Sequence, residues 1–194
     1  MPKVSQEHLE RRRQQILDAA AGCFARQGFH ATSMQDIFAA AGLSAGAVYR
    51  YFPSKTELIR AIAAEALAQA LPALDSAAGQ DAGLPGVLAA LVAELGAGRL
   101  ARLRPVFLQV WAEAVRDEEL AKLARSTLGL LLARIRVLLD RLAGQGRIPP
   151  GTDTDAAAWL ILALLQGYVI QLTVLGDVPP EQVRASAAAL LRQT

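Results

Sequence analysis

The residues best suited to a chemical task lie between Gly42 and Leu58. Small side chains, aromatic hydroxyls and positive charges follow one another there, in the order Ala45, Gly46, Ala47, Tyr49, Arg50, Tyr51 and Lys55. Small residues let another surface approach a helix closely, hydroxyls and cations bind phosphate oxygens, and arginine binds guanine edges. The pattern favours a helix that enters the major groove of DNA.

Capping residues on both sides predict how this segment folds. Gly42 can take the left-handed conformation that ends the preceding helix, and Ser44 can cap the next one. Pro53 disfavours helix at the residue before it, and Ser54 to Glu57 forms a capping box that starts another helix. We therefore expect a helix of about two turns over residues 44–52, with Val48 and Phe52 inward and the opposite face free.

Two residues are costly where they stand unless a partner binds. Gly46 costs about 1 kcal/mol relative to alanine inside a helix, which is reasonable where another surface must come close. Lys55 lies in the first turn of its helix, where the macrodipole disfavours a cation by about 0.3–1 kcal/mol. A phosphate at that helix end would offset the second cost, because the lysine and free N–H groups would share the anion.

The segment from Thr32 to Leu58 resembles the helix-turn-helix of the tetracycline-repressor (TetR) family. Its Thr-Ser start, Ala-Gly-Leu-Ser turn, Gly-x-x-Tyr-x-Tyr-Phe helix and Ser-Lys-x-x-Leu exit carry the likeness, which covers about the first 60 residues. The resemblance implies bases near Ala45, Gly46, Ala47, Arg50 and Tyr51, and phosphates near Tyr49 and Lys55. It also places Arg12, Thr32, Ser33, Gln35 and Ser44 in the DNA-binding set.

Several of these residues have an ordinary structural interpretation as well. The Arg11–Arg13 triplet can be a solvated helix start or a phosphate or minor-groove contact. Ser33 can cap a helix, bind phosphate, or do both. The two tyrosines can cover a small core. Ala45 and Ala47 can only touch thymine methyl groups, so specificity would depend on Arg50, Tyr51, water or DNA shape.

Composition favours packed helices and gives no global basic field. The 194 residues are 53% apolar but only 5% aromatic, with a net charge of +2. Residues 1–60 hold eight Lys and Arg against five Asp and Glu, and the remainder holds twelve against thirteen. The DNA-binding hypothesis therefore depends on where the charges lie.

We predict an all-α chain with an N-terminal three-helix DNA-binding domain and a C-terminal helical domain for ligand binding and dimerisation. The expected ranges are 1–54 for DNA binding, 55–74 for a connecting helix and 75–194 for the second domain. We expect further helices over residues 11–27, 33–41, 55–71, 87–96, 100–115, 118–143, 154–175 and 181–192. Pro72 is expected to stop the connecting helix, a loop is expected over 75–86, and Pro105 either begins or kinks its helix.

The last two helices are more apolar than a small monomer readily hides. A dimer built from two helices of each subunit would bury the excess, and burial within the subunit is the alternative. The candidate interface residues are Leu162, Val169, Leu172, Ala187, Leu190 and Leu191. A second set of large rings and amides can line an effector cavity or form ordinary core; it comprises Phe107, Gln109, Trp111, Trp159, Gln166 and Tyr168.

The sequence shows no nucleophile motif, phosphate loop or metal-ligand spacing, so we expect no enzyme activity, no metal and no cofactor. Cys23 is expected to be a buried helix residue, with redox sensing as the alternative. The most apolar stretch, 156–165, is short for a membrane span, and a cytoplasmic location is expected. The leading hypothesis is a dimeric transcription regulator, most often a repressor, that a small apolar effector releases from a palindromic operator. The rivals are a regulator of the same fold without a small ligand and a helical carrier of hydrophobic molecules.

Overall fold

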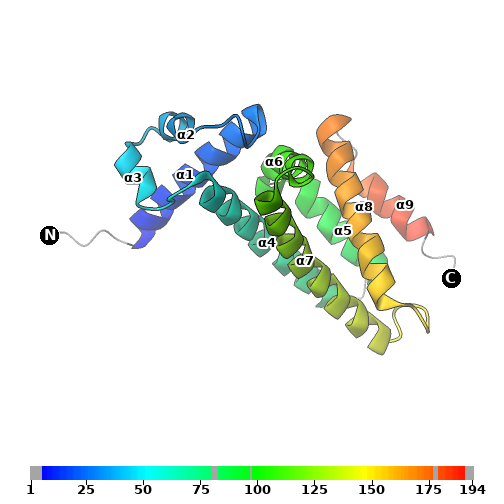
Figure 1. The fold of residues 1–194 in the computed structure, drawn as a ribbon. Coiled ribbons are helices and arrows are strands. Elements are labelled where there is room, and N and C mark those ends of the chain that lie inside the picture. Colours follow the sequence, from blue (N-terminus) through cyan, green and yellow to red (C-terminus); the bar gives the residue numbers. More distant parts are fainter. Residues whose placement is uncertain (1–5, 80–82, 97, 177–178, 191–194) are drawn as a thin grey trace. The chain divides into compact units, whose positions relative to one another are not determined.

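The computed structural model describes residues 6–79, 83–96, 98–176 and 179–190. The regular structure in these ranges is helical, which confirms the predicted all-α class. Figure 1 labels the helices: α1 (Gln6–Gln27), α2 (Met34–Ala41), α3 (Ala45–Tyr49), α4 (Lys55–Gly79), α5 (Gly83–Gly96), α6 (Gly98–Ala114), α7 (Glu118–Gly144), α8 (Thr154–Val174) and α9 (Pro180–Leu190).

The helices pack into two compact units whose bounds differ from the expected ranges. The first unit contains Met1–Glu65 and Pro105–Leu123, and the second contains Ala66–Arg104 and Ala124–Thr194. Helix α4 therefore starts in the first unit and ends in the second. The second half of α6 and the start of α7 pack with the N-terminal helices, which no local sequence signal indicates.

The predicted caps fix the ends of the short helices. Ser33 caps α2 through a complete capping box with Asp36, and Gly42 ends α2 in the left-handed conformation at φ 64°. The hydrogen bonds from the Ser33 side chain and backbone lower the pKa of the Asp36 carboxyl. Ser44 caps α3 by accepting from the N–H of Ala47. The path of the chain through the helix-turn-helix thus follows from local chemistry.

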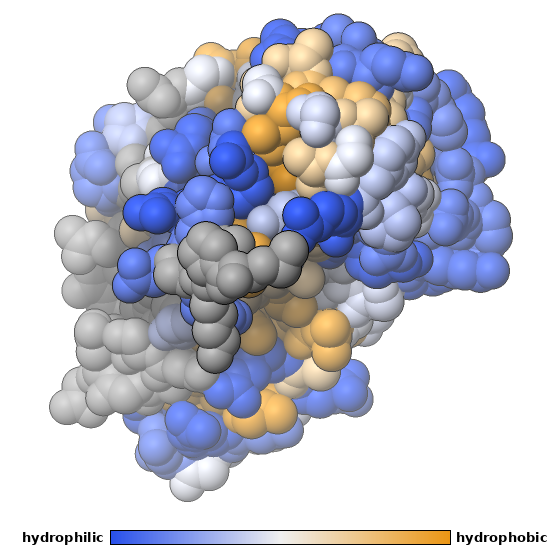
Figure 2. All heavy atoms as spheres, turned by 90° about the vertical axis from the view of Figure 1, so that its left-hand side faces the viewer, coloured by the Kyte–Doolittle hydropathy of each residue, from blue (hydrophilic) through white to orange (hydrophobic). Residues whose placement is uncertain are grey.

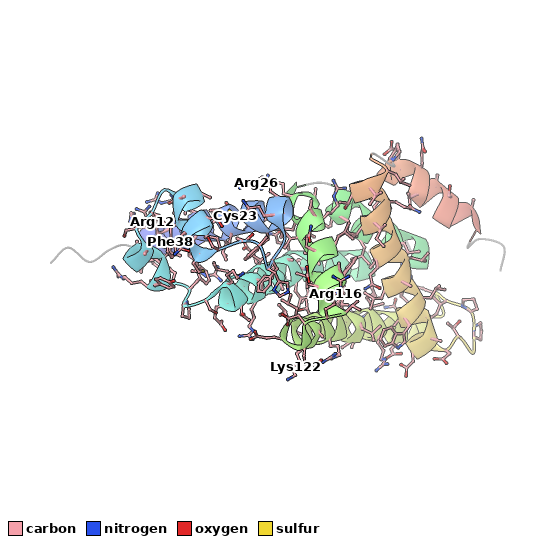
Figure 3. The ribbon with its side chains drawn as sticks, turned by 45° about the horizontal axis from the view of Figure 1, so that its top comes forward. Arg12, Cys23, Arg26, Phe38, Arg116 and Lys122 are labelled. Atoms are coloured by element: carbon pink, nitrogen blue, oxygen red, sulfur yellow. The ribbon has the colours of Figure 1, made fainter. Side chains whose placement is uncertain are left out.

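The core of the first unit is formed where α1, α2, α3 and α4 meet. Its fully buried members include Ile16, Leu17, Phe24, Ile37, Val48, Leu58, Ile59 and Ile62. Val48 and Phe52 point inward, as predicted from their positions. Cys23 is buried, also as predicted, and Arg26 Nη2 donates to its Sγ at 3.6 Å (Figure 3).

The predicted stop of α4 at Pro72 is wrong, because the helix continues to Gly79. An interior proline loses one backbone hydrogen bond and costs about 3 kcal/mol. Leu71, next to it, packs against the buried cluster of the second unit, and that burial helps to retain the helix. Of the loop expected over 75–86, residues 75–79 and 83–86 are helical, and residues 80–82 lie outside the described ranges. Pro105 lies inside α6, not at its start.

The core of the second unit is formed by α5, α7 and α8. Leu88 and Leu91 of α5, Ile135 and Leu139 of α7, and Ile161 of α8 belong to one buried cluster. Helix α5 also packs against α9, and the three helices α5, α8 and α9 lie side by side in Figure 1.

Helix α8 is longer and more apolar than the sequence estimate for 156–165 suggested. It has 21 residues, and its most apolar window of 18 residues has a mean hydropathy of 1.8, with 39% of that window buried. By length and composition alone the helix could cross a membrane. Its buried residues form one stripe: Ala158, Ile161, Leu162, Leu165, Tyr168, Val169 and Leu172. A core helix of a water-soluble protein has the same properties.

Candidate DNA-binding site

Helix α3 presents the predicted small face to solvent. Ala45, Gly46 and Arg50 are exposed, Ala47 and Tyr51 are partly buried, and Tyr49 is 48% exposed. On the opposite side Val48 is fully buried and anchors the helix. The arrangement leaves a short helix whose outer side can meet another molecule without any movement of the core.

Gly46 is not required by the packing of the protein itself. A Cβ atom placed on Gly46 would meet no atom of the chain within 4 Å, and the residue has no positive φ. Alanine would fit and would improve helix propensity. The open space beside Gly46 leaves room for a surface that approaches α3 from outside.

We expect Gly46→Ala to raise or preserve the free energy of unfolding, by up to about 1 kcal/mol. The same change should weaken DNA binding, because the added methyl group would overpack the contact at a cost of about 1–3 kcal/mol. Urea unfolding and fluorescence anisotropy with a duplex give the two values. Gly129→Ala is the matched control, since Gly129 is an exposed helical glycine of α7 with equally open surroundings. Unchanged DNA affinity in Gly46→Ala would contradict the close approach.

Aromatic contacts hold the C-terminal end of α3 and the residues that follow it. The ring of Phe38 on α2 meets the ring of Tyr49 edge-on, with centroids 5.2 Å apart. The guanidinium of Arg13 lies over the ring of Phe52 at 5.6 Å and also pairs with Glu10. Phe38, a functional neighbour that no sequence pattern indicates, restricts the orientation of the exposed Tyr49.

Helix α1 contributes a polar side chain that fixes the turn before α3. Gln15 Nε2 donates to the carbonyl of Ala41 at 2.7 Å, directly before the turn at Gly42. Arg12 Nη1 donates to Gln15 Oε1 at 3.0 Å and remains at the surface, and Figure 3 labels it together with Phe38. Of the arginine triplet, Arg13 contacts Glu10 and Phe52, and Arg12 contacts Gln15 at the surface of the helix.

The N-terminal end of α2 leaves two of its three predicted DNA-binding side chains accessible to solvent. Gln35 is exposed, and Ser33 is partly exposed although its Oγ also donates to Asp36 at 2.6 Å. Thr32 is 1% exposed, and its Oγ1 donates to the carbonyl of Gly28 at 2.7 Å. The prediction for the Thr32 side chain is therefore wrong, because its hydroxyl is used inside the protein.

Lys55 also has an internal partner set that its sequence position did not reveal. Its Nζ donates to three backbone carbonyls, of Phe29 at 2.8 Å, His30 at 3.2 Å and Thr32 at 2.7 Å. The ammonium lies 4.9 Å from the centre of the Phe29 ring, and burial lowers the pKa of the lysine. An ammonium has three hydrogens to donate, so this corrects the prediction that the side chain holds a phosphate.

We expect Lys55→Met to lower the free energy of unfolding by about 1–3 kcal/mol, because three carbonyls lose their donor. The dependence of DNA affinity on salt should stay at the wild-type slope. Arg12→Ala is the comparison variant, and loss of a phosphate contact should reduce that slope by about one unit per subunit. Binding titrations at several salt concentrations separate the two cases. An equal reduction in Lys55→Met would restore the phosphate role.

Figure 2 views the molecule from the side on which α1, α2 and α3 lie in Figure 1. Hydrophilic residues cover much of the visible surface, with the largest apolar area near its top and smaller apolar areas lower down. The charge excess of residues 1–60 is small, so the proposed recognition depends on particular side chains and not on a broad basic patch.

The six predicted effector-pocket residues do not line the hollow that the structure describes. This hollow, of about 390 Å³ between α4 and α7, is lined by Leu67, Leu71, Leu130, Ala133, Arg134 and Val137. Phe107, Gln109 and Trp111 are partly buried residues of the first unit. In the second unit Trp159 is 61% exposed, Gln166 is partly buried and Tyr168 is buried against Val92 and Leu172.

The predicted interface residues of α8 belong to the core of the subunit. Leu162, Val169 and Leu172 are 3%, 3% and 7% exposed, which corrects the expectation that they face a partner. Leu191 lies outside the described residues, and the side chains of Ala187 and Leu190 are likewise not described. A different set on α8 is exposed: Trp159, Leu160, Leu164, Ile170 and Val174.

Comparison with known proteins agrees with this architecture. Residues 16–62 match the model for "Bacterial regulatory proteins, tetR family", and residues 84–194 match the model for "BetI-type transcriptional repressor, C-terminal". The uncharacterized HTH-type transcriptional regulator YfiR of Bacillus subtilis is 31% identical over 171 residues, which cover 87% of this chain and 83% of that one.

Solved structures share the fold over nearly the whole chain. Salmonella enterica GusR is 27% identical with a TM-score of 0.80, covering 98% of this chain and 100% of that one. The transcriptional regulator FadR from Bacillus subtilis in complex with stearoyl-CoA is 21% identical with a TM-score of 0.76, covering 93% and 97%. With its N-terminal helix-turn-helix and its helical second unit, this chain belongs to the TetR family of transcriptional regulators.

Proposed function

We propose that this regulator binds a palindromic operator as a cytoplasmic homodimer, represses transcription, and is released by a small, largely apolar effector. The observation that carries the DNA-binding part is the exposed face of Ala45, Gly46 and Arg50 on a helix anchored by Val48. Ala45 and Ala47 offer methyl contacts to thymine, and Arg50 can bind a guanine edge with two hydrogen bonds. Tyr49, Arg12, Ser33, Gln35 and Ser44 are proposed to bind the flanking backbone.

The second apolar stripe of α8 supports the dimer. Its large exposed side chains are accompanied by small residues, the exposed Ala156 and Ala163 and the partly buried Gly167. Small residues permit two helices to pack closely, and a second copy of α8 is a self-complementary partner under two-fold symmetry. Two subunits paired in this way would carry two recognition helices to successive major grooves of a palindrome.

The effector proposal is supported by the apolar hollow between α4 and α7 and by the fold itself. Five of the six residues that line the hollow are apolar, and Arg134 is the only charged one among them. A structure of the same fold, Bacillus subtilis FadR, holds stearoyl-CoA. An effector releases DNA only to the extent that it binds the two conformations with different affinity.

The test is selection of bound sequences from random duplex DNA by the full-length chain. Enrichment of a palindrome with two half-sites about one helical turn apart is the expected result, and enrichment of no sequence would overturn the operator proposal. A thermal-shift screen of apolar compounds, with stearoyl-CoA as the first probe, then tests the effector. A compound that raises the melting temperature and lowers affinity for the selected palindrome would support it. Stabilisation by no compound would favour a regulator without a small ligand.

A further inference from the structure

One face of α6 and the turn after it contact the loop between α1 and α2. Gln109, Glu113 and Asp117 follow one another at intervals of four residues, which places them on one side of a helix and its continuation. The loop residues opposite them are Gly28 and His30. All of these residues belong to the first compact unit.

The contacts between the two segments are polar and specific. His30 Nε2 lies 3.4 Å from Glu113 Oε2 and 3.6 Å from Asp117 Oδ2. An imidazole with its proton on Nε2 can donate to these carboxylates, and the imidazolium adds charge attraction. Gly28 has a φ of 83°, and a Cβ atom there would come within 3.3 Å of Gln109 Oε1. The side chain of His30 therefore holds the loop, and the conformation of Gly28 and its closeness to Gln109 restrict which residue can stand at position 28.

The same loop is held from its other side by α4. Lys55 Nζ donates hydrogen bonds to the loop carbonyls of Phe29, His30 and Thr32. A further contact joins α4 to α7, from Thr56 Oγ1 to Glu119 Oε2 at 3.3 Å. The next residue after the loop is Ser33, the cap of α2. Any shift of the loop therefore moves the end of α2 that is proposed to contact DNA.

We propose that His30 is a positioning residue for DNA binding, which joins the α6–α7 turn to the N-terminal end of α2 through Glu113 and Asp117. The proposal rests on the DNA contact proposed for Ser33 and the start of α2. Without this contact the loop has more conformational freedom. Binding to DNA must then order the loop, and the entropy lost in ordering it lowers the affinity for DNA. His30 itself need not touch DNA.

A charge exchange tests the proposal in the full-length dimer. In His30→Glu the new carboxylate lies beside those of Glu113 and Asp117, and like charges repel. The affinity for the selected palindrome should therefore fall about three- to tenfold. Adding Glu113→Lys should return the affinity to within about twofold of the wild type, because opposite charges again face each other. Glu113 is chosen because Asp117 Oδ1 also accepts from the N–H groups of Glu119 and Leu120, and its replacement would disturb the start of α7.

Urea unfolding of the four proteins in the cycle distinguishes positioning from stability alone. If the charge exchange restores DNA affinity, the proposal is supported. If it restores the free energy of unfolding but not the DNA affinity, the proposal is overturned. Unchanged affinity in His30→Glu also overturns it. If His30→Glu does not fold, His30→Ala and Glu113→Gln replace it, and each should lower affinity while the pair lowers it no further. Arg50→Ala is measured in parallel to separate the two proposals. If it leaves specific binding intact, the proposal that α3 recognises DNA fails, and the role of His30 fails with it.

Discussion

Replacing Arg50 with alanine should abolish most discrimination between the operator and unrelated DNA. Arg50 is exposed at the C-terminal end of α3, and it is the only arginine or lysine on that helix or its caps. A bidentate contact to guanine contributes about 1–3 kcal/mol of discrimination, and a dimer would lose it in both half-sites. Anisotropy titrations with the selected palindrome and with a scrambled duplex measure the ratio of the two affinities.

Arg141→Ala is the matched control for this measurement. Arg141 is an exposed arginine of α7 in the second unit, so its removal changes the net charge equally. It should leave the affinity ratio unchanged. If Arg50→Ala and Arg141→Ala reduce binding alike, Arg50 contributes only general charge. Tyr51 is a less clean test, because its ring is partly buried and its loss would also affect folding.

Placing a carboxylate on the exposed stripe of α8 should separate the subunits. In Leu164→Glu, a side chain that is 53% exposed in the single chain becomes charged, and two-fold symmetry would bring two copies into the proposed interface. A monomer binds only one half-site and loses the gain from simultaneous binding, so operator affinity should fall about a hundredfold or more. Sedimentation velocity and anisotropy report the two effects.

Leu130→Glu provides the comparison, because Leu130 is an equally large residue on α7 that is 60% exposed. It should remain dimeric and bind the operator normally. A Leu164→Glu protein that stays dimeric would place the interface elsewhere. One that is monomeric yet binds as tightly as the wild type would remove the need for a dimer. Circular dichroism checks that both variants retain their helices.

The helix-turn-helix could be predicted from the sequence because short-range chemistry determines it. Ser33, Gly42 and Ser44 act within four residues of their partners, and each does what its type predicts. Pro72 could not be interpreted in the same way. A proline is a strong local signal, but tertiary packing around Leu71 outweighs it, and that packing involves residues far along the chain.

The side-chain roles at the site were harder to predict for the same reason. The exposure of Gly46 and Arg50 follows from their helical position relative to the buried Val48. The partners of Lys55 are carbonyls more than twenty residues earlier, and no pattern near Lys55 indicates them. On α8, an apolar composition on several sides could not show which stripe the subunit buries; the structure assigns Leu162 to the core and leaves Leu164 outside.

The shared packing of residues 1–65 with residues 105–123 has a consequence for how such regulators can be recombined. A hybrid that fuses residues 1–65 to the remainder of another repressor would replace the natural neighbours of His30 with foreign ones. Such a hybrid should regain full operator binding only when the segment around Glu113 is transplanted as well. The unit that can be transferred to another regulator therefore consists of two separate segments, residues 1–65 and 105–123. Substitutions in one segment should be accompanied in evolution by substitutions in the other.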